Sequence, residues 1–241
     1  NNKFTFIIPA RMAASRFPGK PLKKLDGKPI VGWVYDNCIK SKFCKEAIIA
    51  TDSSEIVDYC KLENKNYALT GTHNCASNRV SEVAKNIDDK WVVEVQGDEP
   101  LLWPNLIDSW IKKCLKLANP DIDLYLSVAR LKNKDANNPN FVKLIINDSK
   151  KLLWVSRSKI PSDWKGNIKS RFYRHTGFHL WRVDSLINFS NIEPSQFEIS
   201  EDTHAVRMVE NQFYAHTVIL EETQSIDVPD DLIAAKKLIM N

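Results

Sequence analysis

The sequence predicts an α/β protein with a mostly parallel sheet and a smaller antiparallel extension. Three observations support this fold class. Short apolar runs alternate with helical patterns through the first half of the chain, which is typical of parallel strands joined by crossover helices. Strand-like segments joined by polar turns dominate the second half. The composition, with 43% hydrophobic and 27% charged residues, is that of an ordinary globular protein.

In the first half, we expect strands at 4–9, 46–52, 66–70 and within 91–100. Helical apolar spacing predicts helices over 29–41 and 53–64 and a further one through Val80 and Val83, and Ser53 is a typical helix cap. Ligands of such sheets bind beyond the carboxyl ends of the strands. The 10–22 loop, Asp52 and Asp98 each follow a strand, so we expect them on one rim.

In the second half, strands are expected at 123–131, 141–148 and 151–161, with a hairpin turn over 147–151 and antiparallel pairing among these three. A further strand is expected at 212–220. Helical spacing returns over 202–209, and a closing helix over 228–240 carries Pro229 in its first turn. The chain contains no internal repeat or Gly/Ser linker. We therefore expect a single domain over 1–241.

Charge and cysteine content narrow the functional classes. A net charge of +4 is too small to indicate nucleic-acid binding. The five cysteines include no CxxC pair, so they indicate neither a disulfide framework nor a zinc site, and we expect reduced thiols in the cytoplasm. No apolar stretch reaches the ~18 residues of a membrane span, and the N-terminus does not resemble a signal peptide. We expect no membrane partner.

The loop after the first strand can hold an anion. Three prolines restrict the backbone conformations of the loop, and its small side chains leave the backbone accessible to a ligand. The loop also carries three cations, Arg11, Arg16 and Lys20. Backbone N–H groups and these cations could surround a phosphate. Neither GxxxxGK[ST] nor GxGxxG is present, which disfavours ATPase and dinucleotide readings. A solvated basic loop explains the composition equally well.

Two aspartates are candidate metal ligands. A bound polyphosphate normally brings Mg²⁺, which prefers carboxylate oxygens. Asp98 ends an apolar strand and Asp227 precedes the closing helix. Each also has a plain structural explanation, since Gly-Asp is common turn chemistry and Asp is a common helix cap.

Six segments carry a resemblance to a known family. They are "FIIPARMAASRFPGKPL", "VVEVQGDEPLL", "NPNFVKLI", "WVSRSKIP", "YRHTGF" and "IDVPDDL". Their order and spacing resemble those of the 3-deoxy-manno-octulosonate (Kdo) cytidylyltransferases over nearly the whole chain. The resemblance implies a Rossmann-like, GT-A-like nucleotide-diphospho-sugar transferase fold, with a nucleotide-binding half over about 1–120 and an acceptor-binding and dimerisation part over about 121–241.

The resemblance also implies an activity. Members use CTP and Mg²⁺ to attach CMP to the anomeric hydroxyl of a 2-keto-3-deoxy sugar acid, and they release pyrophosphate. They are cytoplasmic, generally homodimeric, and supply lipopolysaccharide assembly. The implied catalytic residues are Arg11, Arg16, Lys20 and Asp98, and the implied metal ligands are Asp98 and Asp227. The implied substrate-binding residues are Ala10, Asn74, Ser77, Arg79, Gln96, His175, His179, Glu201 and His204.

Departures from the family pattern cluster on the acceptor side. His204 and Ala205 stand where the family has a Glu-Gln pair, His179 replaces a tyrosine, and Asn78 replaces an acid. These changes are either neutral or a sign of an altered acceptor. We expect activity on Kdo or a close relative such as an amino-substituted Kdo, although losing the Glu at 204 weakens any preference for a cationic substituent.

Three other functions remain open at this point. One is a cytidylyltransferase for a nonulosonic acid. The others are a metal-dependent glycosyltransferase and a catalytically silent nucleotide-binding module. The presence of Arg11, Lys20, Asp98 and Asp227 argues against a silent module. A purely structural role is also disfavoured, because a packed core would not need cations and carboxylates at strand ends.

Overall fold

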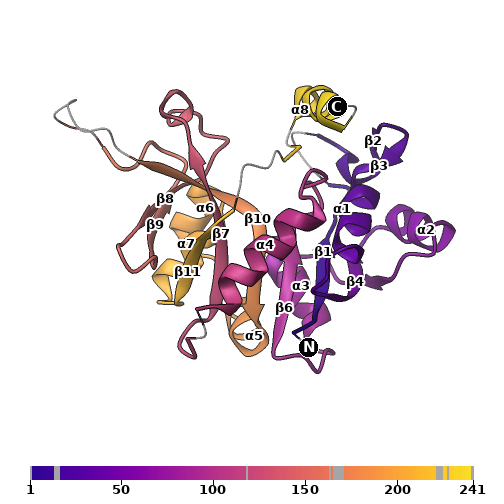
Figure 1. The fold of residues 1–241 in the computed structure, drawn as a ribbon, viewed down its shortest axis with the longest axis horizontal. Coiled ribbons are helices and arrows are strands. Elements are labelled where there is room, and N and C mark those ends of the chain that lie inside the picture. The colour runs from indigo at the N-terminus through magenta and orange to yellow at the C-terminus, as the bar shows by residue number, and fades with distance from the viewer. Residues whose placement is uncertain are drawn as a thin grey trace.

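The computed structural model describes residues 2–13, 17–117, 119–162, 164, 171–220, 225–226 and 228–239. Figure 1 shows the order of the elements along the chain. The strands are β1 (Phe4–Pro9), β2 (Lys24–Leu25), β3 (Lys28–Pro29), β4 (Cys44–Thr51), β5 (Tyr67–Leu69), β6 (Trp91–Val95), β7 (Leu124–Leu131), β8 (Lys143–Ile146), β9 (Leu152–Ser156), β10 (Phe172–Arg182) and β11 (Ala215–Ile219). The α-helices are α1 (Ile30–Ile39), α2 (Ser54–Leu62), α3 (Ala76–Ala84), α4 (Pro104–Leu115), α5 (Val183–Ser190), α6 (Gln196–Glu201), α7 (Ala205–Glu210) and α8 (Pro229–Ile239).

One sheet runs through both halves of the described chain in the order β11-β7-β10-β6-β1-β4-β5, with β8 and β9 joined to it through β10. Pairing is parallel among β6, β1, β4 and β5. It is antiparallel between β10 and each of β6, β7 and β8, and between β8 and β9. The predicted fold class is confirmed. The expected antiparallel hairpin is formed by β8 and β9. Strand β11, whose pairing was not predicted, runs parallel to β7.

The sheet has an apolar layer on each face. Alternate residues of β1 point to opposite sides, so Phe6 and Ile8 pack with α1, α2 and α4, whereas Ile7 packs with α3, α5 and α7. Figure 1 shows α4 lying across one face. Every residue of β1 is buried. Burial on both faces explains why this strand is an almost continuous apolar run instead of an alternating one.

Local signals set most helix ends. The Ser53 hydroxyl accepts a hydrogen bond from the Ile56 N–H (3.3 Å) and begins α2, as predicted. Proline occupies the first position of α4 and of α8, where no N–H partner is needed. Helix α6 is capped by Ser195 and ends at Asp202 in a left-handed conformation (φ 45°). The helix expected over 202–209 therefore begins only at Ala205.

Strand β10 was not expected from the sequence. Its eleven residues include two arginines, two histidines and a threonine, which mask the apolar signal of Phe178 and Leu180 in the core. The register with β7 shifts between His175 and His179. Three of these polar residues, Arg174, His175 and Thr176, line a cavity, which explains their presence in a strand in the middle of the sheet.

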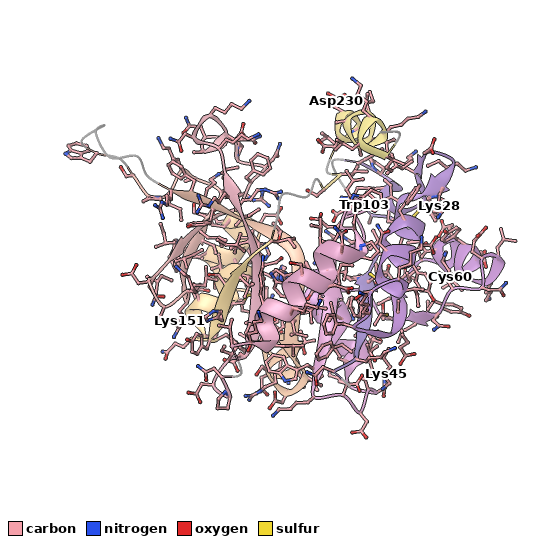
Figure 2. All side chains as sticks on the ribbon, viewed as in Figure 1. Lys28, Lys45, Cys60, Trp103, Lys151 and Asp230 are labelled. Carbon is pink, nitrogen blue, oxygen red and sulfur yellow. The ribbon has the colours of Figure 1, made fainter. Side chains whose placement is uncertain are left out.

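Helix α8 packs on the N-terminal half through a small apolar cluster. Ala235 and Ile226 are buried there beside Trp33 and Trp103, whose rings meet edge to face at 6.4 Å. Figure 2 shows Trp103 close below this helix. No helix in the described ranges has the length and apolarity needed to cross a membrane.

Candidate active site

The carboxyl ends of β1, β4 and β6 meet at one rim, as parallel strands must. A cleft of about 230 Å³ opens there. It is lined by Pro9, Ala10, Arg11, Phe17, Lys20, Pro21, His73, Cys75, Ala76, Arg79, Gln96, Gly97, Asp98 and Asp202. The structure thus brings together Ala10, Arg11, Lys20, Arg79, Gln96 and Asp98 from the predicted site. Arg16 and Asp227 lie outside the described residues.

The opening loop is tied to the end of β6. Gly19 adopts a left-handed conformation (φ 69°), and its N–H donates to the Met12 carbonyl at 3.1 Å. This turn directs Lys20 toward Asp98, and Lys20 Nζ lies 2.6 Å from Asp98 Oδ2. Both side chains are partly exposed, at 15% and 26%. Lys20 and Asp98, which are far apart in the sequence, therefore form an ion pair in the lining of the cleft.

Gly97 lets the two rim segments approach closely. A Cβ at this position would lie 2.9 Å from the Pro9 carbonyl oxygen, closer than backbone atoms tolerate. The glycine therefore allows β6 to end directly beside the start of the opening loop, which fixes the position of Asp98.

Arg79 forms part of the cleft wall and is buried. Its guanidinium donates to Asp52 Oδ2 at 2.9 Å, to the Gly71 carbonyl at 3.2 Å and to the Thr70 hydroxyl. These partners hold the 70–79 segment against the sheet. Asn74, in the same segment, is exposed and borders the second cavity described next.

A second cavity of about 560 Å³ continues from the cleft. The two share six lining residues: Arg11, Cys75, Ala76, Gln96, Asp98 and Asp202. Four arginines line the second cavity, namely Arg11, Arg157, Arg174 and Arg207. Each of the joined cavities therefore carries cations, an arrangement that suits anionic ligands.

Arg157 is held in place by main-chain carbonyls. Its Nε donates to the Glu201 carbonyl at 2.7 Å, and its Nη2 donates to the Asp202 carbonyl at 2.8 Å. The Glu201 carboxylate accepts hydrogen bonds from the Ser156 hydroxyl (2.6 Å) and the Arg157 N–H (2.7 Å). Glu201 does not line either cavity, so the structure places it behind the site, where it supports Arg157.

Arg207 forms a buried ion pair with Glu198. Its Nη2 and Nε reach the two carboxylate oxygens at 2.5 Å and 2.7 Å, and its Nη1 donates to the Ile192 carbonyl at 2.9 Å. The guanidinium stacks over the Phe189 ring at 4.6 Å. The bidentate pair joins α6 to α7 along the cavity wall.

Glu94 is a fully buried carboxylate behind the second cavity. Oε2 accepts from the Ser77 hydroxyl (2.8 Å) and the Trp181 indole (3.1 Å), and Oε1 accepts from Gln96 Nε2 (2.7 Å). Burial raises the pKa of Glu94 to about 7, and these hydrogen bonds only partly offset it. Ser77 also lies 3.2 Å from His204 Nε2. Ser77 therefore lies against this buried group and does not line the cleft.

Three histidines gather beside Glu94. The rings of His175 and His179 stack with centroids 4.8 Å apart, and His204 meets both edge to face at 6.0 and 6.3 Å. Burial lowers the pKa of His175 to about 3 and that of His204 to about 4, and it lowers the pKa of His179 well below its usual value. All three are neutral at pH 7. His175 and His204 line the cavity, whereas His179 lies behind them.

Sequence reasoning missed several of these groups. Glu94 carried a signal, since a charge in the middle of the apolar run "WVVEV" is unusual for a buried strand. Lys143 likewise is a charged residue within an apolar run, "FVKLII", and could have been noticed for the same reason. It is fully buried, and its ammonium donates to the carbonyls of Asn138 (2.9 Å), Phe141 (2.7 Å) and Arg157. Glu198 and Arg207 gave no such signal.

Comparisons with known proteins agree on a family. The family model described as Cytidylyltransferase matches residues 5–225. A 3-deoxy-manno-octulosonate cytidylyltransferase of Geobacter metallireducens is 34% identical, over 95% of each chain. One of Acaryochloris marina is also 34% identical, over 97% of this chain and 96% of the relative. A solved CMP:2-keto-3-deoxy-manno-octonic acid synthetase, complexed with CTP, has a TM-score of 0.89 at 26% identity, over 99% of this chain and 98% of that one.

Proposed function

Because the chain belongs to the family of 3-deoxy-manno-octulosonate cytidylyltransferases, we propose that it transfers CMP from CTP to the anomeric hydroxyl of Kdo or a closely related 2-keto-3-deoxy sugar acid. The acceptor oxygen forms a bond to the α-phosphorus and its hydroxyl proton passes to solvent. The bond from that phosphorus to the β-phosphate bridging oxygen breaks, and pyrophosphate leaves. The observation that carries the proposal is the pairing of Lys20 with Asp98 in a cleft that continues into an arginine-lined cavity.

The cleft residues act on the triphosphate by charge and position. Lys20 and Arg11 line the cleft, so their cations can neutralise the phosphate oxygens as charge moves to the departing pyrophosphate. Asp52 and Thr70 hold Arg79 in the wall. We infer that the Ala10 backbone and the 72–79 segment, apart from Ser77, contact the base and ribose, as the resemblance implies.

Asp98 fits a Mg²⁺ ligand. Its carboxylate is partly exposed at the end of a strand, and it faces the cleft beside a lysine that a bound ion could displace. We propose that Asp98 and Asp227 hold the ion. When bound, Mg²⁺ would supply positive charge for the transferring phosphoryl group.

The acceptor occupies the larger cavity. Arg157 and Arg174 can meet the carboxylate of a sugar acid, and Gln96 lies where the two cavities join. A pKa near 3 makes His175 a weak base at neutral pH. We infer that His175 orients the acceptor by hydrogen bonding and does not remove its proton.

Pyrophosphate release with CTP and Kdo tests the proposal. Asp98→Asn should lower kcat by at least about 100-fold, because an amide is a poorer Mg²⁺ ligand and leaves Lys20 without its charged partner. Asp184→Asn is the matched control, since this carboxylate is exposed and pairs with Arg182. Full turnover by Asp98→Asn at limiting Mg²⁺ would show that the metal assignment is wrong.

Acceptor choice needs a separate comparison. We propose to measure turnover of Kdo, its 8-amino analogue and a nonulosonic acid with CTP. His179 and His204 are neutral, so a cationic substituent gains no charge partner from them. A strong preference for Kdo would exclude an altered acceptor.

The remaining expectations concern assembly and location. We propose a single-domain homodimer, in the cytoplasm, that supplies lipopolysaccharide assembly. Exposed Leu153 and Trp154 on β9 and Ile199 on α6 support a subunit interface in the acceptor-binding part. Light scattering during gel filtration measures the mass directly, and a monomer at micromolar concentration would contradict the dimer.

A further inference from the structure

Glu94, His179 and His204 converge from three distant parts of the chain. Glu94 and His179 are register partners on β6 and β10, and His204 is the cap of α7. One carboxylate oxygen and one ring nitrogen from each histidine all lie within 4.8 Å of one another. This is the one group of three such ligands found among the residues that the structure describes.

Several imidazole nitrogens of this cluster have no hydrogen-bond partner in the described structure. His179 has no exposed surface, and neither of its ring nitrogens has a hydrogen-bond partner within the described structure. His175 Nε2, in the ring stacked on it, is also buried without one. Buried polar atoms nearly always have a hydrogen-bond partner or a ligand. We therefore expect these nitrogens to bind a group that is not part of the described protein atoms. Each unprotonated imidazole nitrogen offers a lone pair.

The carboxylate is already oriented. Ser77, Gln96 and Trp181 hold Glu94 in position by hydrogen bonds. Such outer contacts are typical of ligating carboxylates. Two neutral imidazoles and one carboxylate form a donor set that suits Zn²⁺ and similar transition ions, whereas Mg²⁺ prefers oxygen ligands only.

We propose that Glu94, His179 and His204 bind a divalent transition ion of the Zn²⁺ class, at a site separate from the Mg²⁺ site proposed at Asp98. Ligand atoms around tetrahedral zinc lie about 3.3 Å apart. Modest rotation of the side chains would bring the three atoms to that spacing. His204 must turn from Ser77, to which it now lies at 3.2 Å.

The site would leave a coordination position facing the acceptor. His204 is half-buried and lines the second cavity, so an ion bound to it sits at the cavity wall. An oxygen of the sugar acid, from a hydroxyl or carboxylate, would complete the coordination. This last step rests on the proposed function, but binding of the ion does not.

Metal titration without substrate tests the site. The full-length protein is stripped with EDTA, returned to buffer with excess Mg²⁺ to fill oxygen-ligand sites, and titrated with Zn²⁺ against a chromophoric competitor. We expect one Zn²⁺ per chain. His204→Gln should weaken Zn²⁺ binding by at least about 100-fold, because one of the three side chains that bind the ion directly is lost. His216→Gln is the matched control, since its buried Nδ1 also lacks a partner but it lies in β11 outside this group.

Two further measurements keep the proposal falsifiable if His204→Gln fails to fold. X-ray absorption at the zinc edge of the wild-type protein should show two imidazole ligands, and Asp98→Asn should bind Zn²⁺ as the wild type does. Absence of Zn²⁺ binding, unchanged affinity in folded His204→Gln, an all-oxygen coordination shell, or loss of binding in Asp98→Asn would each overturn the proposal. None of these measurements depends on catalytic activity. Failure of the proposed metal site can therefore be distinguished from failure of the proposed function.

Discussion

Replacing Arg207 by methionine should destabilise the protein strongly. Methionine keeps much of the contact with Phe189 but removes the donors that reach both oxygens of Glu198 and the Ile192 carbonyl. Arg207 is 1% exposed and Glu198 is 6% exposed. The variant therefore leaves a carboxylate buried without its cation.

The size of the effect follows from that burial. Breaking a buried ion pair by removing one partner costs about 3–5 kcal/mol. Glu198 lines the second cavity, so water can partly solvate it, and we expect the lower end, about 3 kcal/mol. For a chain of this size, each kcal/mol shifts the melting temperature by about 2–4 °C, so Tm should fall by about 6–12 °C.

Urea unfolding of four variants measures the effect and its cause. Lys45→Met is the control, because Lys45 pairs with Asp89 at 3.1 Å and its side chain is about half exposed. Lys45 is labelled in Figure 2. It should cost at most about 1 kcal/mol. The double variant Arg207→Met/Glu198→Leu should be clearly more stable than the sum of its single changes predicts. Additive losses would refute the argument, because the ion pair would then contribute no coupling.

Two further predictions concern the rim and the surface. Gly97→Ala should lower kcat/KM for CTP by about 10–100-fold, because its Cβ would press on the Pro9 carbonyl and displace the end of β6, and steady-state kinetics with unchanged values would contradict this. Burial alone would raise the pKa of Asp36, but hydrogen bonds from Lys28 and Lys65 outweigh it and the pKa is lowered. Its stabilising contribution is therefore present above the unfolded-state pKa and lost as pH falls through the lower folded-state value. The difference in urea midpoint between the wild type and Asp36→Asn should accordingly shrink as pH falls from about 6 to about 3, and a constant difference would contradict the assignment.

Much of the parallel half could be predicted from the sequence. Strands that are buried on both faces appear in the sequence as apolar runs, so they can be recognised. Parallel strands end at the same edge of the sheet, which is why Lys20 and Asp98 were expected on one rim. Strand β10 could not be found in this way. Three of its polar residues, Arg174, His175 and Thr176, line a cavity, so its pattern depends on distant segments and not on its own periodicity.

The cavity behind the rim was the harder part to foresee. Glu94 interrupts an apolar strand, but nothing local shows that His179 lies beside it on another strand. The family resemblance directed attention to His179 and His204 as unusual residues. Their meeting with Glu94 depends on strand register, which one-dimensional patterns do not fix. The roles of Arg16 and Asp227 stay predictions.

The junction of β6 and β10 links the two cavities through the main chain. The Gln96 N–H donates to the Gly177 carbonyl at 2.7 Å, so a main-chain hydrogen bond joins the end of β6, which borders the cleft, to the part of β10 that lines the second cavity. Glu94 and His179 face each other on the same pair of strands, and both are fully buried. A substitution at either position would therefore change the second cavity indirectly, by moving the residues that line it, and not through direct contact with a substrate.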